Sequence, residues 1–233
     1  MAIPKLTIFI GYDPVESIAF HTLVQSITYH ASQPVHIVPL NIRNLKSHFY
    51  RERDPKQSNE FSFTRFLVPS LMDYQGWALF MDCDMMFRED VFNVFDELRN
   101  QEGKAVYVVK HDYEPGNKLK YLNNVQYAYP RKNWSSFVLW NCGHESNKKV
   151  TREWVQEASG LELHRFTWLD DSEIGELDVR WNWLVGDYKN PPENVANVHW
   201  TLGGPYFNEC RTADFHEEWF EMRDRMMHCA QKS

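Results

Sequence analysis

The sequence predicts an α/β fold in which helices flank a central, mostly parallel sheet. Three successive segments carry this prediction. Residues 6–11 and 35–40 are short apolar runs typical of buried strands, and the apolar residues between them recur at four-residue spacing from Val15 to Ile27. A helix that connects two strands places them side by side and parallel, so the chain opens with a strand–helix–strand unit.

The following segments continue the alternation. Residues 60–71 have the pattern of a helix, and the apolar run at 77–81 that of a strand. A helix at 91–98 and a strand at 105–109 come next. The second half is less regular, and we expect in it a strand at 137–141, a helix at 149–158 and a last strand at 195–200.

The C-terminal segment is expected to form an amphipathic helix. Phe215, Trp219, Met222 and Met226 recur at i, i+4, i+7 and i+11, which gathers them into one stripe. We expect the stripe to pack against the rest of the domain, and a partner or membrane surface is the alternative.

Length and composition fit a single domain over residues 1–233. The chain has 233 residues, of which 43% are hydrophobic and 15% aromatic, enough to bury a substantial core. The net charge is −7 and the Lys and Arg residues are scattered, which disfavours nucleic-acid binding but is compatible with a nucleotide ligand.

Targeting signals and cysteine usage point to the cytoplasm. No apolar run is long enough for a transmembrane segment, and residues 1–5 enter a strand rather than the apolar core of a signal peptide. The four cysteines lack metal-site or disulfide-framework spacing, so we expect reduced thiols, with Cys83 as a packing residue.

Two carboxylates follow the apolar run at 77–81. In an extended strand Asp82 and Asp84 share a face while Cys83 points away, so both can reach one cation. Oxygen ligands suit hard ions such as Mg²⁺ or Mn²⁺. A solvated turn is the alternative, because an isolated Asp-x-Asp is common.

A second group of candidate residues follows the first strand. Gly11, Tyr12 and Asp13 come directly after it, as Asp82 and Asp84 come after the strand at 77–81. Open α/β sheets bind ligands at the carboxyl ends of their strands, so both groups are expected to face one crevice.

Five spaced motifs together resemble the GT-A glycosyltransferases of family eight, which include glycogenin and bacterial lipopolysaccharide galactosyltransferases. Their order and spacing match across nearly the whole chain. The motifs are Ile8-Phe-Ile-Gly-Tyr-Asp13, Phe61-Ser-Phe-Thr-Arg65, Phe80-Met-Asp-Cys-Asp84, Trp168-Leu-Asp-Asp171 and His199-Trp-Thr-Leu-Gly-Gly-Pro205.

The resemblance implies a GT-A enzyme that moves a hexose from a UDP-linked donor to a saccharide or glycan acceptor, with retention of configuration. Residues 1–110 would form the nucleotide-binding half and 111–233 the acceptor side. Asp82, Asp84 and His199 would hold the cation, and a neutral imidazole suits Mn²⁺ better than Mg²⁺. Taken alone, His199 would be interpreted as a structural core or surface histidine, and the surrounding motif reverses that preference.

Further roles are implied at matched positions. Gly11, Tyr12 and Asp13 lie where the family binds the nucleoside, with Tyr12 stacking on uracil and Asp13 accepting from the base or ribose. A turn-forming aspartate before Pro14 is the alternative for Asp13. Arg65 would contact the donor sugar or diphosphate, and an ordinary salt bridge is its alternative.

A second acidic pair is implied to act at the reacting carbon. Asp170 and Asp171 align with the family's Asp-Gln-Asp, whose members lie beside the transferred sugar. A carboxylate at Asp171 would stabilise an oxocarbenium-like transition state. The alternative is that either residue caps the segment beginning at Ser172.

The chain also departs from the family pattern. Trp134-Ser135-Ser136 replaces Asn-Ala-Gly, and Gly204 replaces a lysine that contacts the diphosphate. Backbone N–H groups of Gly203 and Gly204 are candidates to substitute for that lysine. The stretch 110–132 is expected to be a long loop, either an acceptor-binding loop or a surface excursion.

Two rival functions remain. A non-catalytic nucleotide-sugar binding protein would keep the same three ligands. A metal-dependent nucleotidyltransferase would carry a glycine-rich basic loop near its N-terminus, which Gly11-Tyr-Asp-Pro14 does not provide.

Overall fold

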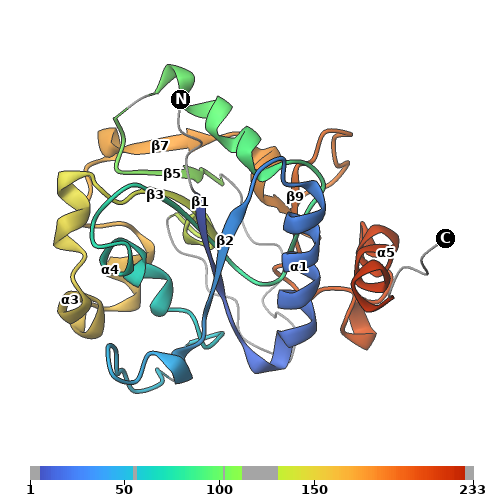
Figure 1. The fold of residues 1–233 in the computed structure, drawn as a ribbon, viewed down its shortest axis with the longest axis horizontal. Helices are drawn as coiled ribbons and strands as arrows, with labels where there is room; N and C mark the ends of the chain where they lie inside the picture. The colour runs from blue at the N-terminus through green and yellow to red at the C-terminus, as the bar shows by residue number, and fades with distance from the viewer. Residues whose placement is uncertain (1–5, 55–56, 102, 112–130, 229–233) are drawn as a thin grey trace.

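A six-stranded sheet runs through the computed structural model, which describes residues 6–54, 57–101, 103–111 and 131–228 (Figure 1). The strand order is β2-β1-β3-β6-β5-β7. Adjacent strands pair in parallel except at β6, which is antiparallel to β3 and β5. The predicted mostly parallel α/β sheet is therefore confirmed. The strands are β1 (Leu6–Gly11), β2 (Val35–Leu40), β3 (Trp77–Met81), β5 (Val106–Val109), β6 (Phe137–Asn141) and β7 (Ile174–Leu177).

A smaller sheet lies at the carboxyl end of β3. It has the order β4-β9-β8 and consists of β4 (Met85–Phe87), β8 (Trp183–Leu184) and β9 (Asn197–His199). Met85 pairs with His199 across the antiparallel β4–β9 ladder. Two segments more than 100 residues apart in the sequence thus meet beside the loop after β3.

Helices cover the sheet in shorter pieces than the sequence suggests. The α-helices are α1 (Ser17–His30), α2 (Val68–Leu71), α3 (Arg152–Glu157), α4 (Gly160–His164) and α5 (His216–Met227). The expected helix at 60–71 begins only with a 3-10 turn at Thr64–Leu67, and the one at 91–98 is a 3-10 segment over Val91–Asn100. Among the described residues, no helix has the length and apolar character that a membrane crossing needs.

The main core lies on both faces of the six-stranded sheet. β3 and β5 are buried almost throughout, which is why their sequences are continuous apolar runs rather than alternating ones. The expected loop at 110–132 falls mostly on residues 112–130, which lie outside the described part of the chain.

A second apolar cluster joins the small sheet to the C-terminal helix. Trp219 and Met222 of α5 are buried against Val198 and Trp200, and α5 lies beside α1 (Figure 1). The expectation that the amphipathic stripe packs against the rest of the molecule is confirmed. This packing anchors the segment that follows His199.

The cysteines of the described residues are free thiols. Cys83 is fully buried, and burial raises the pKa of its thiol well above the ordinary value. Its expected role in packing agrees with this placement.

Candidate metal centre and nucleotide site

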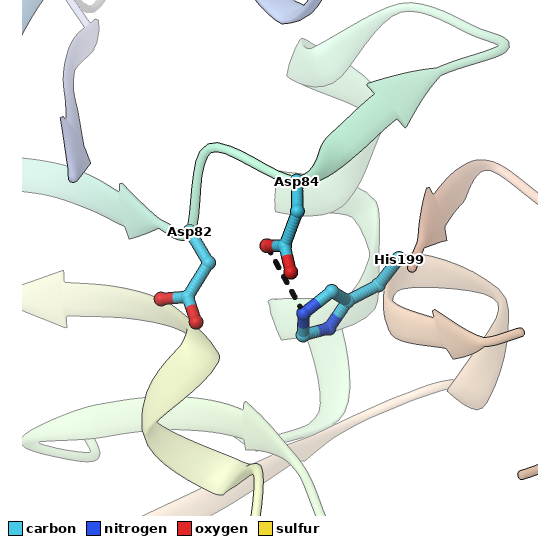
Figure 2. A group of neighbouring side chains, drawn as sticks. All are labelled: Asp82, Asp84 and His199. Carbon is cyan, nitrogen blue, oxygen red and sulfur yellow. Dashed lines mark ion pairs between the residues drawn. The ribbon is translucent and has the colours of Figure 1, made fainter. Parts of the chain in front are cut away.

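Asp82, Asp84 and His199 form a compact buried cluster (Figure 2). One ligand atom from each side chain can be chosen so that all three atoms lie within 4.8 Å of one another. Asp82 directly follows β3, Asp84 directly precedes β4, and His199 is the last residue of β9. The structure thus brings together the three residues that the sequence analysis named as metal ligands.

The chain between the two aspartates bends instead of continuing as an extended strand. The Asp82 N–H donates to Ser136 O at 2.9 Å, and the Trp200 N–H donates to Asp84 O at 3.0 Å. These bonds hold the β3–β4 loop from two sides. The expectation of one extended strand face is corrected here, although both carboxylates still converge while Cys83 points into the core.

The ligand atoms of these three side chains favour a positive charge between them. His199 Nδ1 lies 2.8 Å from Asn182 Oδ1, which only accepts, so Nδ1 carries the hydrogen. In the neutral ring Nε2 therefore presents a lone pair, and it lies 3.3 Å from Asp84 Oδ1. Two such atoms repel each other unless a proton or a cation lies between them. Two carboxylates and one imidazole fit a divalent ion such as Mn²⁺ or Mg²⁺.

Arg65 pairs with one of these candidate ligands. Its Nη1 lies 2.9 Å from Asp82 Oδ1 and also donates to Ser135 O at 2.9 Å. The guanidinium is buried, and its carbon lies 5.3 Å from the ring centre of Phe61 and 5.1 Å from that of Phe80. Arg65 is thus a buried ion-pair partner that holds Asp82 in position, and its contact with the donor stays a prediction.

The turn Trp134–Ser136 connects both sides of the cluster. Ser135 accepts from Arg65 through its carbonyl, and its hydroxyl lies 2.7 Å from His164 Nδ1. The Ser136 hydroxyl accepts from Asn182 Nδ2 at 2.9 Å. Sequence reasoning missed His164 and Asn182. The only local signal for Asn182 is that it is a polar residue between Trp181 and Trp183 in an aromatic stretch.

The residues after β1 form a closed turn. Asp13 accepts from the Val15 N–H at 3.0 Å and from the Glu60 N–H at 3.1 Å, which is the turn-forming alternative. Gly11 is required by packing, since a Cβ there would lie 2.3 Å from the Phe61 ring. Tyr12 remains half-buried, edge-on to Phe20 with ring centres 5.3 Å apart.

The glycines after β9 shape a turn that folds onto this region. Gly203 has a φ of +116°, which favours glycine, and its N–H donates to Trp200 O at 2.9 Å. A Cβ on Gly204 would lie 2.3 Å from the Tyr206 ring. Tyr206 donates to Glu16 Oε1 at 2.6 Å, and burial, followed by the Glu16 charge, raises the pKa of Tyr206 well above its ordinary value. The Gly203 N–H is bonded within the turn, and a phosphate contact by Gly203 or Gly204 stays a prediction.

A curated relative shows the family. Protein CDI of Arabidopsis thaliana is 44% identical over 218 residues, which cover 91% of this chain and 83% of the relative. The chain belongs to the Protein CDI family. No protein-family model matches the sequence.

Solved structures similar to this member of the Protein CDI family are GT-A glycosyltransferases. Galactosyltransferase LgtC, solved with donor and acceptor sugar analogs, superposes with a TM-score of 0.62 at 13% identity, covering 97% of this chain and 98% of LgtC. GlyE of Streptococcus pneumoniae TIGR4 gives 0.64 at 12% identity, covering 95% of this chain and 60% of GlyE. WbbM, a bifunctional glycosyltransferase, gives 0.63 at 14% identity, and the match covers 94% of this chain and half of WbbM. The predicted GT-A fold is confirmed.

The acidic pair at 170–171 lies near the start of β7, whereas the cluster of Asp82, Asp84 and His199 follows the end of β3. Strand pairing places Ile174 level with Ala78 through Val106 and Trp140. Asp82 lies four residues beyond that level, about 13 Å along the strands, whereas Asp171 comes before it. The backbone of Asp171 and that of Asp82 therefore lie at opposite ends of the parallel strands.

The surroundings of the acidic pair are those of a surface turn. Asp170 is the N-cap residue of a 3-10 turn over Asp171–Glu173, and its N–H donates to Glu173 Oε2 at 2.9 Å. Asp171 is exposed and forms an ion pair with Arg131. Capping by Asp170 is the arrangement observed, and the role of Asp170 and Asp171 at the reacting carbon stays a prediction.

Proposed function

We propose that the protein is a glycosyltransferase that moves a hexose from a nucleotide diphosphate sugar, UDP-linked, to a saccharide or glycan acceptor. Mn²⁺ is the proposed cofactor, with Mg²⁺ as the alternative. Residues 1–110 would supply the nucleotide side of the site and 111–233 the acceptor side, within one domain.

One observation carries this proposal. The cluster of Asp82, Asp84 and His199 lies at the carboxyl end of β3, the sheet edge at which α/β folds bind their ligands. Its charge and donor atoms suit a divalent ion that binds a diphosphate. The chain shares its GT-A fold with glycosyltransferases such as LgtC, which was solved with donor and acceptor sugar analogs.

The bound cation would bridge diphosphate oxygens and neutralise the charge on the departing nucleotide. Asp82 and Asp84 contribute negative charge, and Arg65 holds Asp82 through the buried ion pair. Tyr12, half-exposed at the end of β1, is the candidate to stack on the nucleobase. Retention of configuration rests on the family resemblance.

The test is a donor panel in the presence and absence of Mn²⁺. Purified protein is incubated with UDP-linked and other nucleotide sugars, and release of free nucleotide is followed without and with a set of saccharide acceptors. We expect slow, Mn²⁺-dependent release of UDP from one donor, faster with the right acceptor. Asp84→Asn should abolish this release. Asp90→Asn is the matched control, because Asp90 caps the segment at 91–100 and asparagine caps equally well.

The rival functions are distinguished by this assay together with a second incubation that contains a nucleoside triphosphate and a sugar phosphate. Tight binding of a nucleotide sugar with no nucleotide release under any acceptor would identify a binding protein. Formation of a nucleotide sugar and pyrophosphate from a nucleoside triphosphate and a sugar phosphate would identify a nucleotidyltransferase. Either result would overturn the proposal.

A further inference from the structure

A chain of hydrogen-bonded polar side chains extends from the candidate metal ligand His199 through the buried Asn182 and His111 to the half-buried Tyr188. His199 Nδ1 bonds to Asn182 Oδ1 at 2.8 Å. The Asn182 amide nitrogen donates in turn to Ser136 Oγ at 2.9 Å and to His111 Nε2 at 3.0 Å. His111 Nδ1 lies 2.7 Å from the Tyr188 hydroxyl. Asn182 is fully buried, and each of its hydrogen-bonding groups is used.

The orientation of the Asn182 amide follows from Ser136. The Ser136 hydroxyl donates its single hydrogen to Asn133 O at 2.7 Å. Its oxygen can therefore only accept at the contact with Asn182, so the atom facing it must be the amide nitrogen. This leaves Oδ1 facing His199, where it must accept from Nδ1–H.

This orientation of the Asn182 amide fixes which ring nitrogen of the neutral His111 carries the hydrogen. Because the amide nitrogen only donates, His111 Nε2 accepts, and its hydrogen is on Nδ1, facing Tyr188. Burial, with a smaller effect of His199, lowers the pKa of His111 to about 3, so the ring is neutral at physiological pH. The two histidines thus carry their hydrogens on the same ring nitrogen, with one amide between them.

We propose that Asn182 is a positioning residue that keeps His199 in the Nδ1–H tautomer, so that the Nε2 lone pair faces the metal. This inference rests on the proposed function for its purpose. A reversed amide would instead favour hydrogen on Nε2, which would donate to Asp84 and block coordination. Asn182 and Ser136 therefore decide whether the third ligand is available before any cation binds.

The first experiment reads the tautomer without metal. The protein is labelled with ¹⁵N-histidine, treated with EDTA and studied by two-bond ¹H–¹⁵N correlation at about pH 8.5, well above an ordinary histidine pKa. The His199 signal is assigned by its loss in His199→Gln. We expect hydrogen on Nδ1 in the wild type, and a mixture of tautomers in Asn182→Ala and in Ser136→Ala.

The matched control is Asn147→Ala. Asn147 is also fully buried, and its amide nitrogen donates two hydrogen bonds, to Ala105 O and Asn141 O, both at 2.8 Å. These partners lie at the end of the strands opposite Asp82, since Asn141 pairs with Trp77 at the start of β3 and Ala105 precedes β5. Asn147→Ala should lower stability while leaving the His199 tautomer unchanged, which separates positioning from general loss of packing.

The second experiment measures Mn²⁺ affinity by calorimetry. Asn182→Ala should weaken Mn²⁺ binding by about 10- to 100-fold, the usual scale for a residue that orients a metal ligand, whereas Asn147→Ala should change it by less than about threefold. Hydrogen on Nε2 in the wild type, or an unchanged tautomer in both Ser136→Ala and Asn182→Ala, would overturn the inference. If the wild type binds no Mn²⁺, the proposed function fails while the tautomer spectra still decide the role of Asn182.

Discussion

Arg65 Nη1 and Asp82 Oδ1 lie 2.9 Å apart in a buried ion pair, with side-chain exposures of 5% and 11%. The carboxylate that the pair holds is also a candidate metal ligand. Removing one partner of such a pair leaves the other charge buried without compensation, which costs more than the pair contributes. The arrangement orients the Asp82 carboxylate before a cation arrives.

Arg65→Met should therefore be strongly destabilising. We expect the free energy of unfolding in EDTA to fall by about 3–5 kcal/mol, because methionine keeps the apolar stem but leaves Asp82 uncompensated. Urea denaturation followed by circular dichroism measures the change.

The double variant Arg65→Met/Asp82→Asn controls for lost packing. A neutral amide removes the uncompensated charge, so the double variant should be more stable than Arg65→Met alone. Additive losses from the two single substitutions would show that the ion pair is not the cause.

Asp84→Ala should abolish metal-dependent nucleotide binding. The substitution removes one of the three candidate ligands and leaves the diphosphate charge uncompensated. Calorimetry of UDP with and without Mn²⁺ measures the difference, and Asp82→Ala should behave similarly. Asp170→Ala, in the turn before β7, should retain the wild-type Mn²⁺ dependence. If Asp84→Ala also retains it, the metal assignment fails.

The long strands could be predicted from the sequence because burial on both faces leaves a continuous apolar run. The bounds at 6–11, 35–40, 77–81 and 137–141 agree with the structure. The strands at 85–87 and 183–184 could not be predicted, since they have only three and two residues and exist through pairing with β9. Spacing also cannot distinguish an α-helix from the 3-10 segment found at 91–100.

The cluster of Asp82, Asp84 and His199 was predictable because each member has a recognisable sequence neighbourhood. Asp82 and Asp84 follow an apolar run, and His199 begins the motif that resembles the family. Asn182 has no such neighbourhood, because its bonds to Ser136 and His111 span 46 and 71 residues. The position of Asp171 could not be predicted for a related reason, because a short acidic motif does not reveal at which end of the next strand it lies.

Asp171→Asn should leave transfer unchanged. Its carboxylate is exposed and paired with Arg131, and its backbone precedes β7, at the end of the strands opposite Asp82. We therefore expect that the substitution removes no interaction with the reacting carbon. An exposed ion pair contributes at most about 1 kcal/mol to stability. Initial rates at saturating donor and acceptor check this, with Asp84→Asn as the inactive reference. A loss of tenfold or more in turnover would restore the role implied by the family resemblance.

Stability should depend on pH through His111. Burial lowers the pKa of His111 to about 3, against 6.5 for an unperturbed histidine. Between these values the unfolded chain binds a proton that the folded protein does not, so the contribution of His111 is present above pH 6.5 and is lost as the pH falls toward 3. In that window the free energy of unfolding should decrease by up to about 1.4 kcal/mol per pH unit from this group alone.

Urea denaturation of the wild type and His111→Gln in EDTA, from about pH 7.5 to pH 5, measures the effect. The wild-type curve should fall more steeply, because glutamine does not titrate, and the difference between the two proteins should narrow with acidification. Parallel curves would show that the folded and unfolded chains take up the His111 proton over the same pH range, and a His111 Nε2 protonated there could not accept from Asn182.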